Sequence, residues 1–102
     1  AVITLKSKAV INLDEIQYIM SDGHYLEFYL TDKKHPEIDR NTIKNIINLL
    51  PGNQFVQCHR SYIVNLAEIR SIYANKIILP RYVEIPVSRT FKSRVQKLTN
   101  PN

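Results

Sequence analysis

Apolar and polar residues alternate with a period of two along most of the chain, and this alternation predicts a protein built mainly from β-strands. It is clearest over residues 25–30, where Leu26, Phe28 and Leu30 would face a core. An Asp-Gly pair separates this segment from residues 16–20, and such a pair between two strand-like runs predicts a tight hairpin. Further strand-like segments are residues 2–5, 9–11, 35–38, 55–58, 62–64, 68–73, 76–79 and 82–85.

The period changes to that of a helix in residues 41–50. Asn41 or Thr42 can cap the beginning of this helix, and Pro51 followed by glycine would end it. Four apolar residues share one face of the helix: Ile43, Ile46, Ile47 and Leu50.

A second helix is predicted over residues 88–98, after Pro86, with Ser88 as its N-cap. Its apolar stripe would consist of Phe91, Val95 and Leu98. Together these patterns predict an α+β fold rich in β-structure, with antiparallel strands in small sheets and two short helices.

A weak internal repeat accompanies these elements. Residues 11–16, INLDEI, resemble residues 64–69, VNLAEI, at an offset of 53. Residues 41–44, NTIK, resemble residues 89–92, RTFK, at an offset of 48. The repeat predicts two similar β-rich units that lie side by side.

Charge divides the chain into two unlike halves. Residues 1–50 hold six Lys/Arg and seven Asp/Glu, a net −1, whereas residues 51–102 hold eight and two, a net +6. A basic half of this kind favours a polyanionic partner. The length of 102 residues fits one domain, no apolar run approaches a membrane span, and a single cysteine excludes an intramolecular disulfide.

Three side chains suited to reading nucleic acid fall on three predicted turns. His24 follows the Asp-Gly pair, Arg60 lies in the polar stretch between the strands of FVQCHRSYIVNL (residues 55–66), and Arg89 stands at the start of the second helix. An arginine fork matches the O6 and N7 acceptors of guanine, and a helix N-terminus favours anions. Groups on separate turns would let a β-rich domain reach into a groove without a recognition helix.

These segments resemble a LytTR-type DNA-binding domain. YIMSDGHYLEFYL (residues 18–30) is similar to the first half of such a domain, and FVQCHRSYIVNL with IPVSRTFKSRV (residues 85–95) to the second half. The resemblance implies a β-rich output domain of bacterial response regulators that inserts loops into the major groove of double-stranded DNA and regulates transcription in the cytoplasm. It also implies direct-repeat sites, a homodimer on DNA and a receiver domain in the full-length protein, of which residues 1–102 would be a C-terminal domain.

The resemblance also assigns roles to particular residues. Its base-reading positions fall on His24, Arg60 and Arg89, and its phosphate contacts on Ser61, Tyr62, Lys92 and Arg94. His59 and Asn65 would brace loops rather than touch DNA.

Other functions have weaker support in the sequence. Cys58 and His59 are adjacent on a strand, so their side chains point to opposite faces and do not form a nucleophile–base pair. We expect Cys58 to be buried, and a redox role for it stays open. One cysteine and three scattered histidines lack metal-ligand spacing, so we expect no enzyme, metal or cofactor. The alternatives are single-stranded RNA binding through exposed tyrosines and interaction with an acidic protein.

Overall fold

The computed structural model describes residues 1–99, which form ten strands in three antiparallel sheets. The central sheet has five strands in the order β5-β4-β3-β7-β6. A two-stranded sheet consists of β1 and β2, and a three-stranded sheet has the order β10-β9-β8. The strands are β1 (Val2–Thr4), β2 (Val10–Asn12), β3 (Ile16–Asp22), β4 (Tyr25–Leu30), β5 (Glu37–Arg40), β6 (Phe55–His59), β7 (Tyr62–Asn65), β8 (Ser71–Ile72), β9 (Lys76–Leu79) and β10 (Val83–Pro86).

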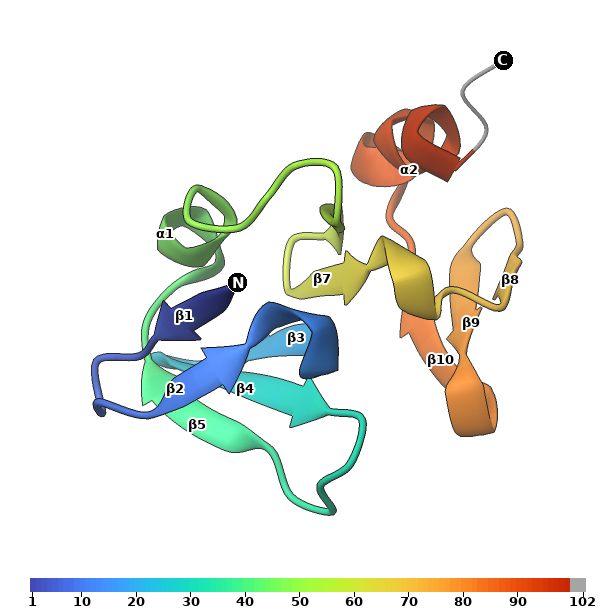
Figure 1. Ribbon diagram of the computed structural model, residues 1–102. Coiled ribbons are helices and arrows are strands. Elements are labelled where there is room, and N and C mark those ends of the chain that lie inside the picture. Colours follow the sequence, from blue (N-terminus) through green and yellow to red (C-terminus); the bar gives the residue numbers. More distant parts are fainter. Residues whose placement is uncertain (100–102) are drawn as a thin grey trace.

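Two layers cover the central sheet, one on each face (Figure 1). The β1–β2 ribbon and α1 (Ile43–Ile47) pack on one face, and the β8–β10 sheet and α2 (Lys92–Thr99) pack on the other. Ile63 and Val64 are neighbours on β7 and belong to the two different cores, as alternation along a strand requires. The predicted β-rich α+β fold with small antiparallel sheets is therefore confirmed.

Local signals correctly predicted the first hairpin and the first helix. Asp22 pairs with Tyr25 across a two-residue turn, and Leu26, Phe28 and Leu30 are buried. Thr42 caps α1, because its hydroxyl accepts a hydrogen bond of 3.1 Å from the Asn45 amide. The helix ends earlier than the predicted residue 50.

Two predicted strands were displaced. The strand expected at residues 35–38 is shifted and forms β5 at Glu37–Arg40. The shift buries Asp39, whose carboxylate accepts hydrogen bonds of 3.1 Å from the amides of Lys6 and Ser7. The strand expected at residues 68–73 shrinks to β8, because a 3-10 turn at Leu66–Glu68 occupies its beginning.

The second helix differs from the prediction at both ends. Arg89–Phe91 form a 3-10 turn and α2 begins only at Lys92, while the Ser88 hydroxyl makes no capping hydrogen bond. Val95 is buried as predicted, but Leu98 is 41% exposed and lines an open groove that also includes Ile47.

The internal repeat is confirmed in the first part of each half. In the β1–β2 hairpin, Val2 pairs with Asn12 and Ile3 with Ile11. Adding 53 to these numbers gives Phe55 with Asn65 and Val56 with Val64, which are pairs of the β6–β7 hairpin. Each hairpin then leads into a 3-10 turn capped by its asparagine, Asn12 or Asn65.

The element order also repeats: each half has a hairpin, a 3-10 turn, three antiparallel strands and a helix. The two halves are not separate units, however. β7 of the second half pairs with β3 of the first, so both contribute to the central sheet, and the prediction of two units lying side by side was wrong in this respect.

Candidate nucleic-acid interface

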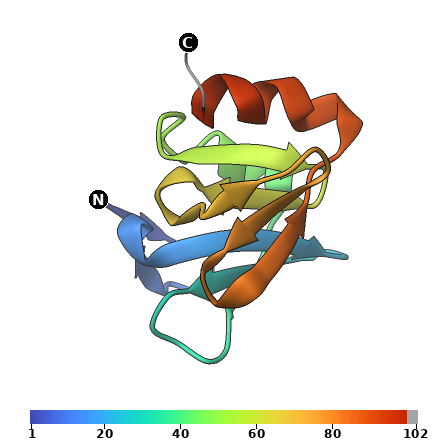
Figure 2. The ribbon, with the colours of Figure 1, turned by 90° about the vertical axis from the view of Figure 1, so that its right-hand side faces the viewer.

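The three turns that carry the predicted base-reading residues lie at one end of the molecule. Figure 2 shows the β3–β4 turn, the β6–β7 turn and the beginning of the second helical segment at its right-hand side. Backbone hydrogen bonds tie them together: the Ser21 amide donates to the Ser61 carbonyl at 2.9 Å, and the Ser88 amide donates to the Cys58 carbonyl at 3.0 Å. Residues that are far apart in sequence thus form one surface, here called the turn surface and centred on His24, Arg60 and Arg89.

His24 occupies the second position of the two-residue β3–β4 turn and is exposed. Gly23, the first position, has φ +60°. A Cβ on Gly23 would meet no atom within 4 Å, so the requirement for glycine comes from its backbone angle alone. The tight turn presents His24 at the tip of the hairpin.

Arg60 stands on a turn whose backbone is held from within. The Nδ1 atom of His59 accepts a hydrogen bond of 3.1 Å from the Ser61 amide, and Gln57 donates to the His59 carbonyl at 3.2 Å. The guanidinium of Arg60 is exposed and forms no ion pair with any residue in 1–99. The predicted loop-bracing role of His59 is therefore confirmed.

Asn65 also braces the fold, as predicted. It is 1% exposed, its amide nitrogen donates to the Ile16 carbonyl at 2.8 Å, and its oxygen accepts from the Ala67 amide at 3.0 Å. This single side chain joins β3 to the 3-10 turn that follows β7.

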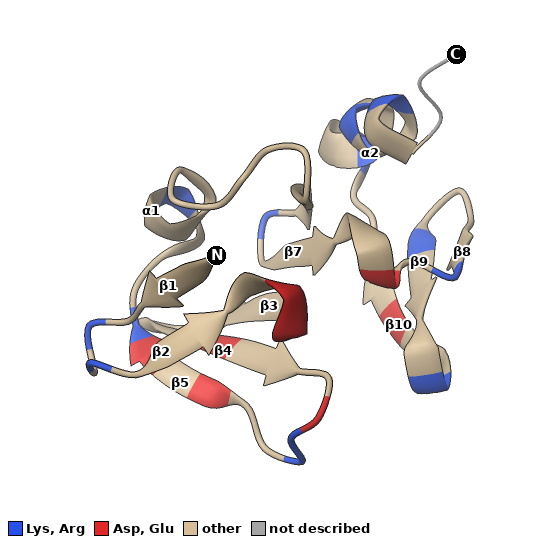
Figure 3. Cartoon of the chain, viewed as in Figure 1, with Lys and Arg blue, Asp and Glu red and all other residues tan. Residues whose placement is uncertain are grey.

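Arg89 begins the 3-10 turn that precedes α2 and is exposed. The Phe91 amide closes that turn on the Ser88 carbonyl at 3.0 Å. Figure 3 shows Lys and Arg along α2, where no Asp or Glu is drawn, and Asp and Glu mainly on β4, β5, their connecting loop and the turn before β3, with others before β8 and on β10. The charge asymmetry of the sequence thus becomes a spatial one, with basic residues following Arg89.

The four predicted phosphate contacts have different surroundings. Ser61 and Lys92 are half-buried beside the turn surface. The Tyr62 ring packs against His59, with centroids 5.5 Å apart, and against Tyr18 at 6.5 Å. Arg94 lies over the Phe91 ring at 5.5 Å and lines a groove that also includes Ile47 of α1.

Arg40 lies beside His24 at the edge of the turn surface and was not predicted from the sequence. The pairing of β4 with β5 places it opposite Tyr25, which directly follows His24, and it is exposed. The predicted strand ended at residue 38, two residues before Arg40, whereas β5 extends to Arg40 and pairs it with the hairpin. Alternation would not have found it, because the apolar Ile38 is 54% exposed and the charged Asp39 is buried, the reverse of the usual pattern.

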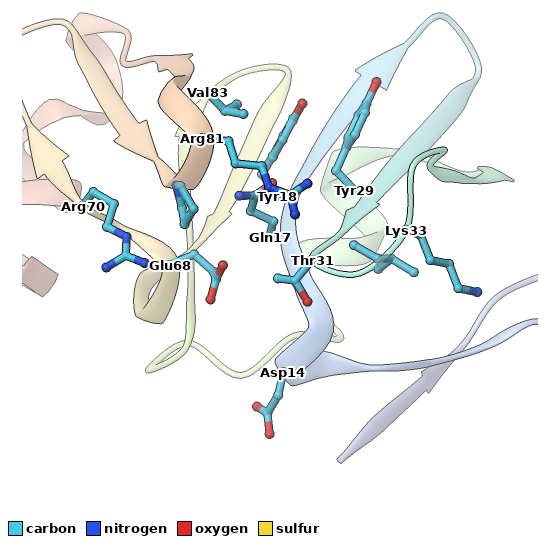
Figure 4. A pocket seen from close by; sticks show the side chains of 12 residues that line it. Asp14, Gln17, Tyr18, Tyr29, Thr31, Lys33, Glu68, Arg70, Arg81 and Val83 are labelled. Carbon is cyan, nitrogen blue, oxygen red and sulfur yellow. The ribbon is translucent and has the colours of Figure 1, made fainter.

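A cavity of about 460 Å³ is lined by none of the predicted DNA-contacting residues (Figure 4). The stacked rings of Tyr18 and Tyr29, 4.4 Å apart, form one wall, and Arg81 extends toward them from the β9–β10 turn. Burial, and then the hydrogen bond from its hydroxyl to Glu27, raise the pKa of Tyr29 above its ordinary value.

Cys58 is a buried free thiol, as predicted. Burial raises its pKa to about 12, and its Sγ lies 3.9 Å from the Tyr62 carbonyl. A neutral buried thiol is a poor nucleophile. Within residues 1–99, no group of three or more His, Cys, Asp or Glu side chains could hold a metal ion. None of the helices in this range combines the length and apolar character that a membrane crossing requires.

Comparison with known proteins identifies the family to which the chain belongs. The family model of the LytTr DNA-binding domain matches residues 6–100. The chain belongs to this family. The resemblance found in the sequence is therefore confirmed, and the LytTr family consists of DNA-binding modules.

Individual relatives agree with the assignment. An uncharacterized response regulatory protein of Vibrio cholerae is 28% identical over 89 residues, which cover 81% of this chain and 34% of that protein. The chain thus spans about a third of that relative's length. The solved LytTr DNA-binding domain of a response regulator from Bacillus cereus superposes with a TM-score of 0.82 at 23% identity, covering 98% of this chain and 97% of that one. At this identity the second match shows that the LytTr fold is shared.

Proposed function

We propose that this LytTr domain binds double-stranded DNA at specific sequences and acts as the output domain of a transcriptional regulator. The observation that carries the proposal is the turn surface, where three exposed side chains suited to base edges stand on three turns joined by backbone hydrogen bonds. Turns of this kind can enter the major groove, which is about 12 Å wide and displays a distinct pattern for each base pair.

Each residue has a role that follows from its chemistry. Arg60 and Arg89 can each donate two hydrogen bonds to one guanine, and His24 can donate to or accept from a base edge. Ser61, Tyr62 and Lys92 are the phosphate contacts, because they flank the reading residues. Arg94 is the weakest candidate of that group, since it packs over Phe91.

The proposal includes partners beyond DNA. The Vibrio cholerae relative is named a response regulatory protein and is about three times as long as the matched segment. We infer that a receiver domain accompanies this domain in the full-length protein, and that homodimers or paired copies occupy direct-repeat sites. Sharing recognition between two copies would offset the small number of base contacts made by one.

Selection from a randomised duplex pool at moderate salt, with a single-stranded RNA pool beside it, tests the proposal. We expect one duplex motif to be enriched. Equal, salt-sensitive binding to every pool would reduce the function to a basic surface. Preference for the RNA pool would replace the proposal with RNA binding through exposed tyrosines.

A charged phosphate contact can be separated from a base contact. Lys92→Ala should weaken binding to all duplexes alike and lower the magnitude of the slope of log K against log salt by about one, because one cation fewer displaces counterions. Titrations at several salt concentrations measure that slope. Lys97→Ala is the matched control, since Lys97 is an exposed cation farther along the same helix. An unchanged slope for Lys92→Ala would remove Lys92 from the phosphate contacts.

A further inference from the structure

A fourth turn lies at the same end of the molecule as the three reading turns. In Figure 2 the β8–β9 turn, residues 73–75, is at the right-hand side with the other three. The Val87 amide donates a hydrogen bond of 2.9 Å to the Asn75 carbonyl, so the tip of this turn is fixed two residues before Arg89. In the order of elements it is the second-half counterpart of the β3–β4 turn that carries His24.

The turn presents two neutral polar side chains to solvent. Tyr73 is 56% exposed, and the Lys76 ammonium lies 5.4 Å from the centroid of its ring. Asn75 is exposed, and its side-chain amide makes no hydrogen bond within residues 1–99. The Tyr73 amide bonds to the Lys76 carbonyl at 2.8 Å, so the backbone under both side chains is ordered.

Residues 73–75 carry no charged side chain, and the lysine that follows them is already paired. Lys76 Nζ forms an ion pair of 3.0 Å with Glu84, so the turn carries no net charge of its own. The β8–β9 turn therefore lacks the positive charge by which phosphate contacts are usually recognised in a sequence. A tyrosine hydroxyl and an asparagine amide nevertheless donate hydrogen bonds well to phosphate and sugar oxygens.

We propose that residues 73–75 are a fourth DNA-contacting turn, in which the Tyr73 hydroxyl and the Asn75 amide bind the sugar–phosphate strand beside the base pair reached by Arg89. This inference rests on the proposed DNA binding and extends its footprint on one side. Because both donors are neutral, their contacts release no counterions. Because they bind the backbone, they add affinity without base preference.

A double variant with matched controls tests the fourth turn. Tyr73→Phe with Asn75→Ala removes both donors and leaves the backbone bonds of the turn intact. Tyr82→Phe with Asn53→Ala removes the same groups from exposed residues away from the turn surface: Tyr82 is 91% exposed on the β9–β10 turn, and Asn53 is next to Gln54, which bonds to Asp14. Binding is measured on a long duplex and on duplexes shortened from either end.

The first double variant should bind the long duplex about tenfold more weakly than wild type, the size expected for two lost hydrogen bonds. Its salt slope and its ranking of base sequences should be unchanged, and the loss should vanish on the duplex shortened from one particular end. The control double variant should bind like wild type.

Other outcomes overturn the proposal in distinguishable ways. Equal affinity of the first double variant and wild type on the long duplex removes the fourth turn and leaves the proposed function standing. An equal loss on every shortened duplex shows that the effect is not a flanking contact. A wild-type domain that binds no duplex overturns both this inference and the proposed function.

Discussion

The two halves of this domain have the same order of strands and α-helices but differ in function and in charge. Residues 2–16 and 55–69 share hairpin register and an asparagine-capped 3-10 turn. In the first half the hairpin is a separate ribbon over one core, whereas in the second it completes the central sheet and presents Arg60. The first half has a net charge of −1 and the second a net charge of +6. A repeated framework can thus remain recognisable while the residues on its turns diverge in function.

The two cap asparagines should differ most in their contribution to stability. Asn65→Ala should lower the free energy of unfolding by about 2–3 kcal/mol, because it leaves the Ile16 carbonyl without its partner in a buried site. Asn12→Ala should cost about 1 kcal/mol or less, since its cap to Asp14 is exposed and water can replace it. Urea denaturation of both variants measures the difference in unfolding free energy. Equal losses would show that the buried hydrogen bond from Asn65 to the Ile16 carbonyl adds no stability.

The repeat aligns Cys58 with Leu5, so a titratable thiol stands in the second half where the first has a hydrocarbon. The folded pKa of about 12 lies above the ordinary value of 9.0, so the folded state holds its proton more tightly than the unfolded state. Stability from this group is complete below pH 9 and falls as pH rises from 9 toward 12, by up to about 1.4 kcal/mol per pH unit.

Denaturation of wild type and Cys58→Ala between pH 8 and 11 isolates this effect, because the other titrating groups are shared. The decline should be shallower for Cys58→Ala. In the native wild type, the thiol should also resist alkylation at neutral pH and react after unfolding. Rapid alkylation of the folded protein would contradict the burial of Cys58 and reopen a redox role.

The two glycines provide the smallest contrast. Gly23→Ala should destabilise the domain by about 1 kcal/mol or somewhat more, since alanine is strained at φ +60°. Gly52→Ala should be neutral or slightly stabilising, because Gly52 has no such angle and an added Cβ would meet open space. Thermal unfolding compares the two, and a neutral Gly23→Ala would mean that the β3–β4 turn tolerates another conformation.

Signals confined to a few neighbouring residues predicted much of this molecule. The Asp-Gly hairpin, the cap at Thr42 and the burial of Cys58 depend on local preferences and on alternation, which the sequence displays directly. The resemblance to the LytTr family rested on motifs of similar length.

Features set by contacts between distant segments were not predictable in this way. β5 shifted because Asp39 caps amides more than thirty residues away, and Arg40 moved to the hairpin with it. The second helical segment begins with a 3-10 turn in place of the predicted α-helical N-terminus. The residue before this turn, Ser88, donates its amide to the Cys58 carbonyl of a distant strand. The nearness of residues 73–75 to Arg89 likewise follows from the pairing of β9 with β10, which the bond from the Val87 amide to the Asn75 carbonyl extends by one step.

The most direct test of the central claim compares Arg89→Ala with Arg70→Ala on the selected duplex and on a shuffled duplex of the same composition. Both variants remove an exposed arginine, but Arg70 lines the cavity that includes none of the predicted DNA-contacting residues. Arg89→Ala should cost about 1–3 kcal/mol on the selected duplex and far less on the shuffled one, while Arg70→Ala should affect both slightly and alike. Equal losses on the two duplexes for Arg89→Ala would contradict base reading by the turn surface.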